Sequence, residues 1–253
     1  HHGIVLGSGM AAVSAALLGV LEAGDHIIGS DQLYGRSLRL LKEDLPRLGI
    51  ETSLVDTTQA DYVAVARRPN TKMILIEAVS NPTLRVADLT GIAAWAAEQQ
   101  VILAVDNTFT TPKAIRPFDF GADIVIHSVT KLLAGHSDVT LGYVAAKDLG
   151  LREKIYTFSV TTGMTASPFD CWLAERGLLT FPLRFEKTQA TAGALAKMLA
   201  QHKGVARVLY PGQASHPDFT RAQAILGQNG CNMVSFELAN QTREAAERFT
   251  KAA

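Results

Sequence analysis

Short runs of apolar residues alternate with stretches of helical periodicity over about the first 150 residues of the chain. The apolar runs are continuously hydrophobic, which is typical of parallel strands that are covered on both faces. This pattern predicts an α/β fold with a mostly parallel sheet. Strands are expected at residues 4–6, 26–30, 51–55, 73–78, 101–105, 123–127 and 141–146, with helices at 10–22, 36–48 and 88–100.

The pattern changes after about residue 150, where helical stretches dominate. Helices are expected at residues 152–158, 168–177, 183–202 and 218–226 and from about 242, and strands at 205–209 and 233–238. The change predicts a large domain over residues 1–182 and the opening of a smaller α+β domain over residues 183–253.

Composition limits the kind of protein this can be. The chain has 253 residues, of which 47% are hydrophobic, so it can bury a sizeable core. Its formal net charge is zero, which argues against a nucleic-acid or membrane-surface partner. The apolar run from Met10 to Leu21 is too short to span a membrane. The histidines lack metal-ligand spacing and the two cysteines form no metal or disulfide pattern, so we expect no metal and two buried free thiols in a reducing cytoplasm.

Two charged residues follow apolar strands and indicate a site. Asp106 ends one strand, and Lys131 follows another 25 residues later. Ligands of open α/β sheets bind beyond the carboxyl ends of the strands. A lysine and an aspartate there predict a Schiff base to pyridoxal phosphate (PLP), with the aspartate keeping the pyridinium nitrogen protonated. Taken singly, Lys131 could be a solvated loop lysine and Asp106 an Asx-type turn at a strand exit.

Other polar groups at strand ends could complete such a site. The turn at Gly9 and Met10 opens a helix whose free N–H groups could bind an anion, although by itself this signal is weak and a small residue in a tight turn explains it better. Asn81 precedes a proline and could contact the ring oxygen, or simply form a turn. The hydroxyls of Ser128 and Thr130 could bind the cofactor phosphate. Tyr34 could stack on the ring and move a proton, or be a half-buried loop tyrosine.

In order and together, these motifs resemble those of the Cys/Met-metabolism family of PLP-dependent enzymes. The family includes cystathionine γ-synthase, the cystathionine lyases, homoserine-ester sulfhydrylases and methionine γ-lyase. The resemblance covers nearly the whole chain and implies an aspartate-aminotransferase-like (fold type I) large domain. It implies Lys131 and Tyr34 as catalytic residues and a cofactor site made of Gly9, Met10, Tyr34, Asn81, Asp106, Ser128, Thr130 and Lys131.

The resemblance also implies the reaction. The substrate would be a small amino acid of the cystathionine or activated-homoserine class, with its C–S bond made or broken by elimination or replacement at the β or γ carbon. The family forms homotetramers, as dimers of dimers with shared sites. Its N-terminal segment would precede residue 1, and its arginine for the substrate carboxylate would follow residue 253.

Two other functions stay open at this point. The chain could be a non-catalytic scaffold that keeps the fold and its oligomer interface. It could also be a nucleotide-binding Rossmann protein, which the absence of the glycine fingerprint disfavours. The sequence does not separate β-elimination, γ-elimination and γ-replacement.

Overall fold

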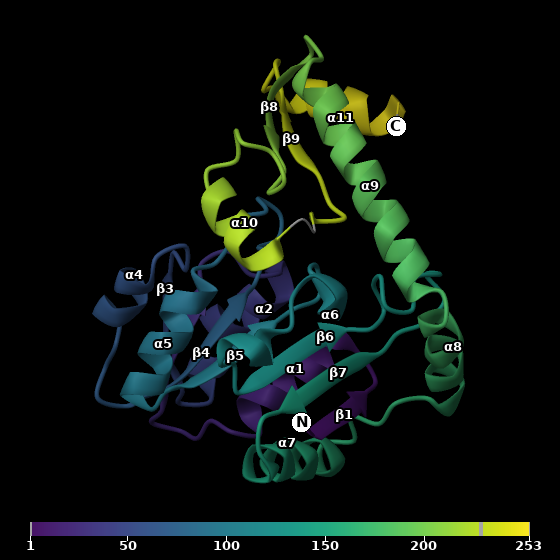
Figure 1. Cartoon of the computed structure of the whole chain (residues 1–253). Helices are drawn as coiled ribbons and strands as arrows, with labels where there is room; N and C mark the ends of the chain where they lie inside the picture. Colours follow the sequence, from purple (N-terminus) through teal and green to yellow (C-terminus); the bar gives the residue numbers. More distant parts are fainter. Residues whose placement is uncertain (1, 228–229, 253) are drawn as a thin grey trace.

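The computed structural model describes residues 2–227 and 230–252 and confirms the α/β prediction. Seven strands form one sheet in the order β1-β7-β6-β5-β4-β2-β3, and only β7 runs against the others (Figure 1). The strands are β1 (His2–Leu6), β2 (His26–Ser30), β3 (Glu51–Val55), β4 (Thr71–Glu77), β5 (Ile102–Asp106), β6 (Ile124–Ser128) and β7 (Gly142–Ala146).

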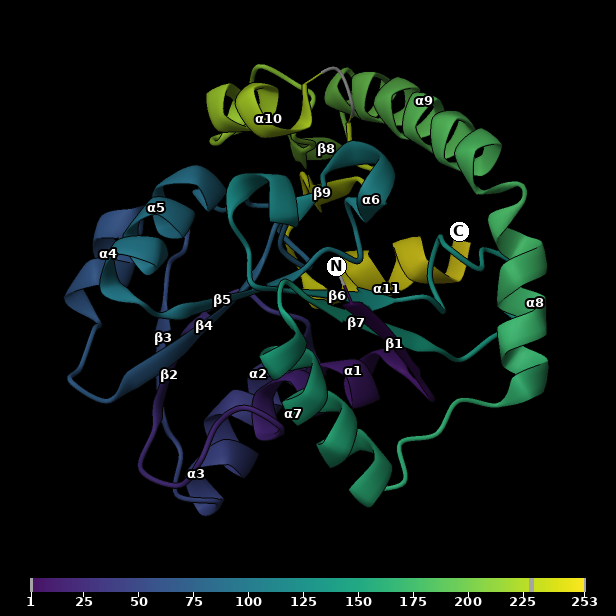
Figure 2. The ribbon, with the colours of Figure 1, turned by 60° about the horizontal axis from the view of Figure 1, so that its bottom comes forward.

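Helices cover both faces of this sheet, as its continuously apolar strands require. On one face lie α1 (Gly9–Leu18), α2 (Gly35–Arg39), α3 (Leu45–Arg47) and α7 (Leu149–Thr161), and on the other α4 (Ala60–Val65) and α5 (Leu89–Gln99) (Figure 2). The short helix α6 (Thr111–Ala114) and a 3₁₀ turn (Pro117–Phe120) follow β5. Caps fix several starts: the side chains of Ser8, Asp88 and Asp148 accept backbone N–H bonds in the first turns of α1, α5 and α7.

Side-chain alternation along the strands decides which residues face which helices. Met73 and Leu75 of β4 pack in the core under α1, whereas Ile74 and Ile76 belong to the core on the opposite face. Because the period is two, the last residue of β4, Glu77, points toward the α1 side. The same alternation brings the last residues of β5 and β6 to that side.

A second lobe follows α8 (Pro168–Leu178) and consists of α9 (Phe181–Ala200), β8 (Val205–Leu209), α10 (Phe219–Leu226), β9 (Ser235–Leu238) and α11 (Arg243–Ala252) (Figure 1). β8 and β9 pair antiparallel. The predicted domain boundary at residues 182 and 183 falls inside α9, and one hydrophobic core joins α9, β8 and α10 to the sheet. Residues 1, 228, 229 and 253, which fall within the two predicted domains, lie outside the described residues.

Two helices depart from their predicted form. The helix expected at residues 10–22 ends at Leu18, where Gly19 leaves room for the backbone of α7. The helix expected at 36–48 contains a π-helical turn (Leu40–Asp44) between α2 and α3. Pro46 has no N–H, and the wider turn just before it bonds the Leu45 N–H to the Leu40 carbonyl. The sequence pattern did not predict α4.

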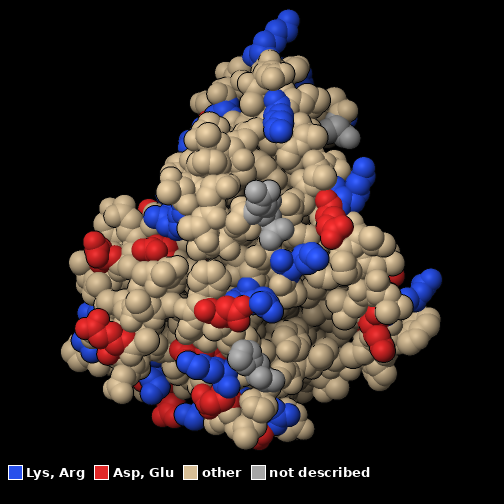
Figure 3. Space-filling model, in the orientation of Figure 1, with Lys and Arg blue, Asp and Glu red and all other residues tan. Residues whose placement is uncertain are grey.

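The surface and the cysteines complete the comparison with the sequence. Basic and acidic side chains are interspersed over the lobe that contains the large sheet in Figure 3. Within the described residues, no helix is long and apolar enough to cross a membrane. Cys231 is a buried free thiol, as predicted. The same prediction is wrong for Cys171, which is only half-buried because its helix, α8, lies at the edge of the molecule (Figure 1).

The turn after β6 is held by Arg184 of α9. The guanidinium of Arg184 donates to the carbonyls of Leu132, Leu133 and Gly177, the last two at 2.9 and 2.7 Å. Gly135 ends this turn at φ +79°, and a Cβ there would collide with the guanidinium. The turn therefore depends on a planar donor group that reaches three carbonyl oxygens at once.

Replacing Arg184 by lysine should lower the free energy of unfolding by about 2–4 kcal/mol, because a lysine cannot satisfy the three carbonyls together. Urea denaturation measures the loss. The control is Arg243→Lys, an exposed residue paired with Glu247, which should change stability by less than about 0.5 kcal/mol. Equal losses in the two variants would contradict this role of Arg184.

Candidate active site

A cavity of about 540 Å³ opens at the carboxyl ends of β4, β5 and β6, beside the N-terminus of α1. It lies where ligands bind in open α/β sheets. Seven of the eight residues predicted for the site line it: Gly9, Met10, Tyr34, Asn81, Asp106, Ser128 and Lys131. They come from five separate segments of the chain, so the tertiary structure brings together what the sequence only suggested.

Thr130 is the predicted residue that does not line this cavity. Its hydroxyl donates to the carbonyl of Leu141 at 3.1 Å and accepts from the Leu141 N–H at 3.0 Å. These bonds tie the turn after β6 to the start of β7. Thr130 instead borders a neighbouring cavity that shares Lys131 with the first.

The start of α1 forms one wall of the site. Ser8 caps the helix by accepting the Ala11 N–H at 3.0 Å. Gly9 and Met10 begin the helix and line the cavity, so the positive end of the helix dipole lies beside it. A Cβ on Gly9 would lie 2.8 Å from the side chain of Ser128. Only glycine therefore lets the helix start come this close to the end of β6, and the wall suits an anion.

Asp106 is fixed by a short network at the end of β5. Its Oδ1 accepts the N–H of Thr108 at 3.0 Å and the hydroxyl of Thr108 at 2.5 Å. The Thr108 hydroxyl in turn accepts the Ser128 N–H at 2.9 Å. Burial raises the pKa of Asp106, and the Thr108 bonds oppose that rise. Both donors go to Oδ1, and no donor to Oδ2 is found within the described part of the chain.

A second carboxylate, Glu77, was missed by the sequence analysis. It ends β4 directly beside Asp106, its register partner on β5. One oxygen accepts the Tyr34 N–H at 2.6 Å and the other accepts the Asn81 N–H at 2.9 Å. Burial, reinforced by the Asp106 charge, raises the pKa of Glu77 from 4.5 to about 8. A single side chain thus holds the two loops that bring Tyr34 and Asn81 to the cavity.

The sequence did carry a signal for Glu77. It ends an apolar strand in the same way that Asp106 does, a position where a carboxylate is costly to bury. The pattern could not show that its oxygens bind two backbone N–H groups, one of them 43 residues away.

Lys131 and Tyr34 stand at the open side of the cavity. The backbone of Lys131 is set in a turn, since its N–H bonds to the Ser128 carbonyl at 3.2 Å and its carbonyl accepts the Gly135 N–H at 2.9 Å. Its amine forms no ion pair within the described residues, and its side chain lines the cavity. Tyr34 is 44% exposed and lines the mouth.

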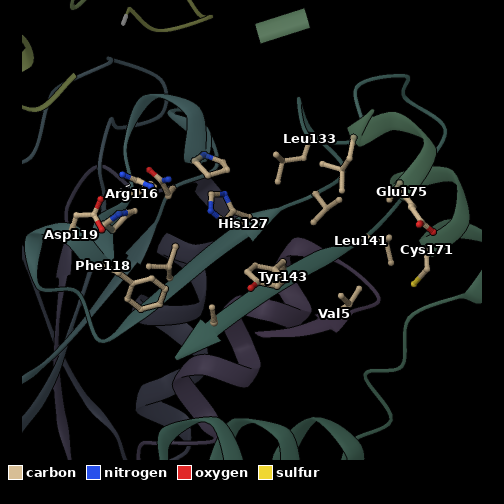
Figure 4. A pocket seen from close by; sticks show the side chains of 18 residues that line it. Val5, Arg116, Phe118, Asp119, His127, Leu133, Leu141, Tyr143, Cys171 and Glu175 are labelled. Atoms are coloured by element: carbon tan, nitrogen blue, oxygen red, sulfur yellow. Dashed lines mark ion pairs between the residues drawn. The ribbon is translucent and has the colours of Figure 1, made fainter. Parts of the chain in front are cut away.

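A larger cavity of about 710 Å³ lies on the opposite face of β6 and β7 (Figure 4). Its lining is mainly apolar and includes His127 and Tyr143. His127 is buried, which lowers its pKa to about 4, and its Nδ1 has no partner within the described residues. None of the eight predicted site residues lines this cavity, so size alone does not identify the site.

Comparison with known proteins identifies the family of the chain. The family described as Cys/Met metabolism PLP-dependent enzyme matches residues 1–253. The chain is 41% identical to cystathionine beta-lyase MetC of Bacillus subtilis over 98% of this chain. It is also 41% identical to cystathionine gamma-lyase of the same organism over 95% of this chain.

A third relative is a probable cystathionine gamma-synthase of Herpetosiphon aurantiacus, 38% identical over 88% of this chain and 69% of the relative. The chain spans 63% of the length of each of the two Bacillus subtilis relatives. These two relatives are therefore longer than this chain, and the similarity covers only part of each of them.

The pKa of Glu77 predicts a pH dependence of stability in the protein without a ligand. The folded state keeps the Glu77 proton up to about pH 8, whereas the unfolded chain releases it near 4.5. The stability from the protonated carboxyl is therefore present below pH 4.5 and is lost as the pH rises through about 8.

Glu77→Gln removes this charge at every pH, so its stability relative to the unchanged protein should rise as the pH increases from 4.5 to about 8 and stay level above that. Urea denaturation over this range measures the difference. Glu98→Gln, at an exposed glutamate, is the control and should follow the unchanged protein at every pH. A Glu77→Gln curve parallel to that of the unchanged protein would show that Glu77 is not the titrating group.

Proposed function

Because the chain belongs to the Cys/Met-metabolism family of PLP-dependent enzymes, we propose that its cavity holds PLP and acts on sulfur amino acids. The observation that carries the proposal is the meeting of Lys131, Asp106 and the start of α1 around one cavity. An amine, a half-buried carboxylate and a helix N-terminus match the aldehyde, the ring nitrogen and the phosphate of this cofactor.

The residues present fit that group. The close approach at Gly9 leaves the Ser128 hydroxyl beside the first-turn N–H groups of α1, which suits a phosphate. Asp106 lines the cavity, and its Oδ2, which accepts no hydrogen bond within the described residues, can accept a ring N–H, whose positive charge would offset the cost of burying the carboxylate. We retain Thr130 in the proposed phosphate site as a residue that fixes the turn of Ser128 and Lys131.

The other residues act on the substrate and on the ring. When bound, PLP supplies an electron sink for charge that develops at the substrate. Lys131 would hold the cofactor through its amine and would take and return the proton at the substrate α carbon. The Tyr34 phenol would stack on the ring and move a second proton, and the Asn81 amide would contact the ring oxygen. Glu77 fixes the backbone of both Tyr34 and Asn81 by accepting their N–H groups.

We propose cystathionine as the substrate, with cleavage or formation of its C–S bond at the β or γ carbon. The support is the set of relatives, whose names include a β-lyase, a γ-lyase and a probable γ-synthase of cystathionine. The resemblance further supports a cytoplasmic homotetramer and a division into domains at residues 182 and 183.

Lys131→Ala should abolish the visible absorption band of bound PLP and lower kcat by about a thousandfold or more, because the amine that holds the cofactor and moves the proton is removed. Absorption spectroscopy and a keto-acid assay measure these effects. The matched control is Lys113→Ala, at a half-exposed lysine near Glu186, which should leave both unchanged. A Lys131→Ala protein that keeps band and turnover would refute the assignment.

The products formed from cystathionine identify the reaction. Homocysteine, pyruvate and ammonia indicate cleavage at the β carbon, whereas cysteine, 2-oxobutyrate and ammonia indicate cleavage at the γ carbon. An acylhomoserine supplied with cysteine tests the synthetic direction. We expect the full-length protein to release or consume a thiol in one of these assays. Bound PLP without turnover of cystathionine, methionine or an acylhomoserine would instead favour the scaffold.

A further inference from the structure

We propose that Asp218, in the second lobe, is a positioning residue for Asn81. The proposal rests on the function inferred above, in which the Asn81 amide contacts the PLP ring. Asp218 does not touch the cavity. It acts through Arg85, at the far end of the loop that carries Asn81.

The loop that carries Asn81 is a closed unit. Val79 and Val86 form an isolated antiparallel bridge at its base. Inside the bridge, the Ser80 N–H donates to the Arg85 carbonyl at 2.9 Å, and the Arg85 N–H donates to the Ser80 hydroxyl at 3.0 Å. Arg85 is therefore fixed to the residue that precedes Asn81, so a shift of Arg85 is passed directly to Asn81.

Asp218 of the second lobe binds the Arg85 end of this loop. Its carboxylate accepts Nε of Arg85 at 2.6 Å, Nη2 of Arg85 at 3.1 Å and the Val86 N–H at 3.0 Å. Arg221 donates to the same carboxylate and to the Val86 carbonyl, each at 3.1 Å. The two-pronged contact with Arg85 fixes direction as well as distance.

The Asp218 carboxylate is shielded from solvent. Only 5% of the Asp218 side chain is exposed. Burial by itself raises the pKa of Asp218, but the hydrogen bond from Arg85 and the other donors lower it overall. Removal of the Asp218 carboxylate would leave both Arg85 and Arg221 without the counter-charge that they share. This separates the Asp218 contacts from the exposed ion pairs of the surface, which contribute little.

Asn81 is thus held from two sides. From the sheet, Glu77 accepts its N–H at 2.9 Å. From the second lobe, Asp218 holds Arg85, and the Ser235 hydroxyl donates to the Pro82 carbonyl at 2.5 Å. The position of the second lobe therefore determines where the Asn81 amide lies relative to the cavity.

The test compares Asp218→Asn with the unchanged protein as full-length PLP-bound enzymes. We expect the affinity for PLP to fall about fivefold, the effect of losing roughly one hydrogen bond. The pH midpoint of the visible absorption band should shift by about half a unit in the direction that Asn81→Ala produces. Asp119→Asn, which breaks an exposed pair with Arg116, is the matched control and should change neither value.

A double variant separates positioning from stability. If Asp218 acts through Asn81, Asn81→Ala with Asp218→Asn should match Asn81→Ala alone in affinity and midpoint. Additive effects would overturn the proposal, as would an Asp218→Asn enzyme that is less stable but has an unchanged midpoint and PLP affinity.

A second variant covers the case in which Asp218→Asn does not fold. Arg85→Lys keeps the charge but cannot make the two-pronged contact, so it should give the same shift. An unchanged protein that binds no PLP would defeat the proposed function itself. A normal PLP band with no response to either variant would defeat this inference alone.

Discussion

The parallel register of β4, β5 and β6 is the constraint around which the site is built. It sets Glu77 beside Asp106 and places Ser128 on the next strand, with all three side chains directed to the α1 side of the sheet. Two carboxylates in a row at a buried edge are costly, and each has its own donors. The start of α1 and the Asn81 loop lie around these three residues and complete the lining of the cavity.

The two carboxylates divide the work because their donors differ. Asp106 uses one oxygen for Thr108, whereas Glu77 uses both oxygens for backbone N–H groups. Glu77 is therefore occupied as a structural acceptor, and Asp106 is left able to meet a cation. In the proposed enzyme this distinction makes Asp106 the partner of the ring and Glu77 the support of the residues around it.

The second lobe takes part in this arrangement rather than being appended to it. Its core continues into the core of the sheet, and its charged residues close around the Arg85 end of the Asn81 loop. Arg184 likewise joins α9 to the turn that carries Lys131. The Asn81 loop and the turn that carries Lys131 are thus both held by side chains from the second half of the chain.

The strands, the α/β class and most candidate residues could be predicted from the sequence, because continuous apolar runs and the polar residues that end them are local signals. Lys131 and Asp106 stand out at strand ends for the same reason. Tertiary packing was needed to show that Glu77 joins them, that the Thr130 hydroxyl turns to Leu141, and that Asp218 reaches Arg85 across 133 residues. These are hydrogen bonds between distant segments, and their geometry exists only once the sheet register and the packing of the second lobe are set.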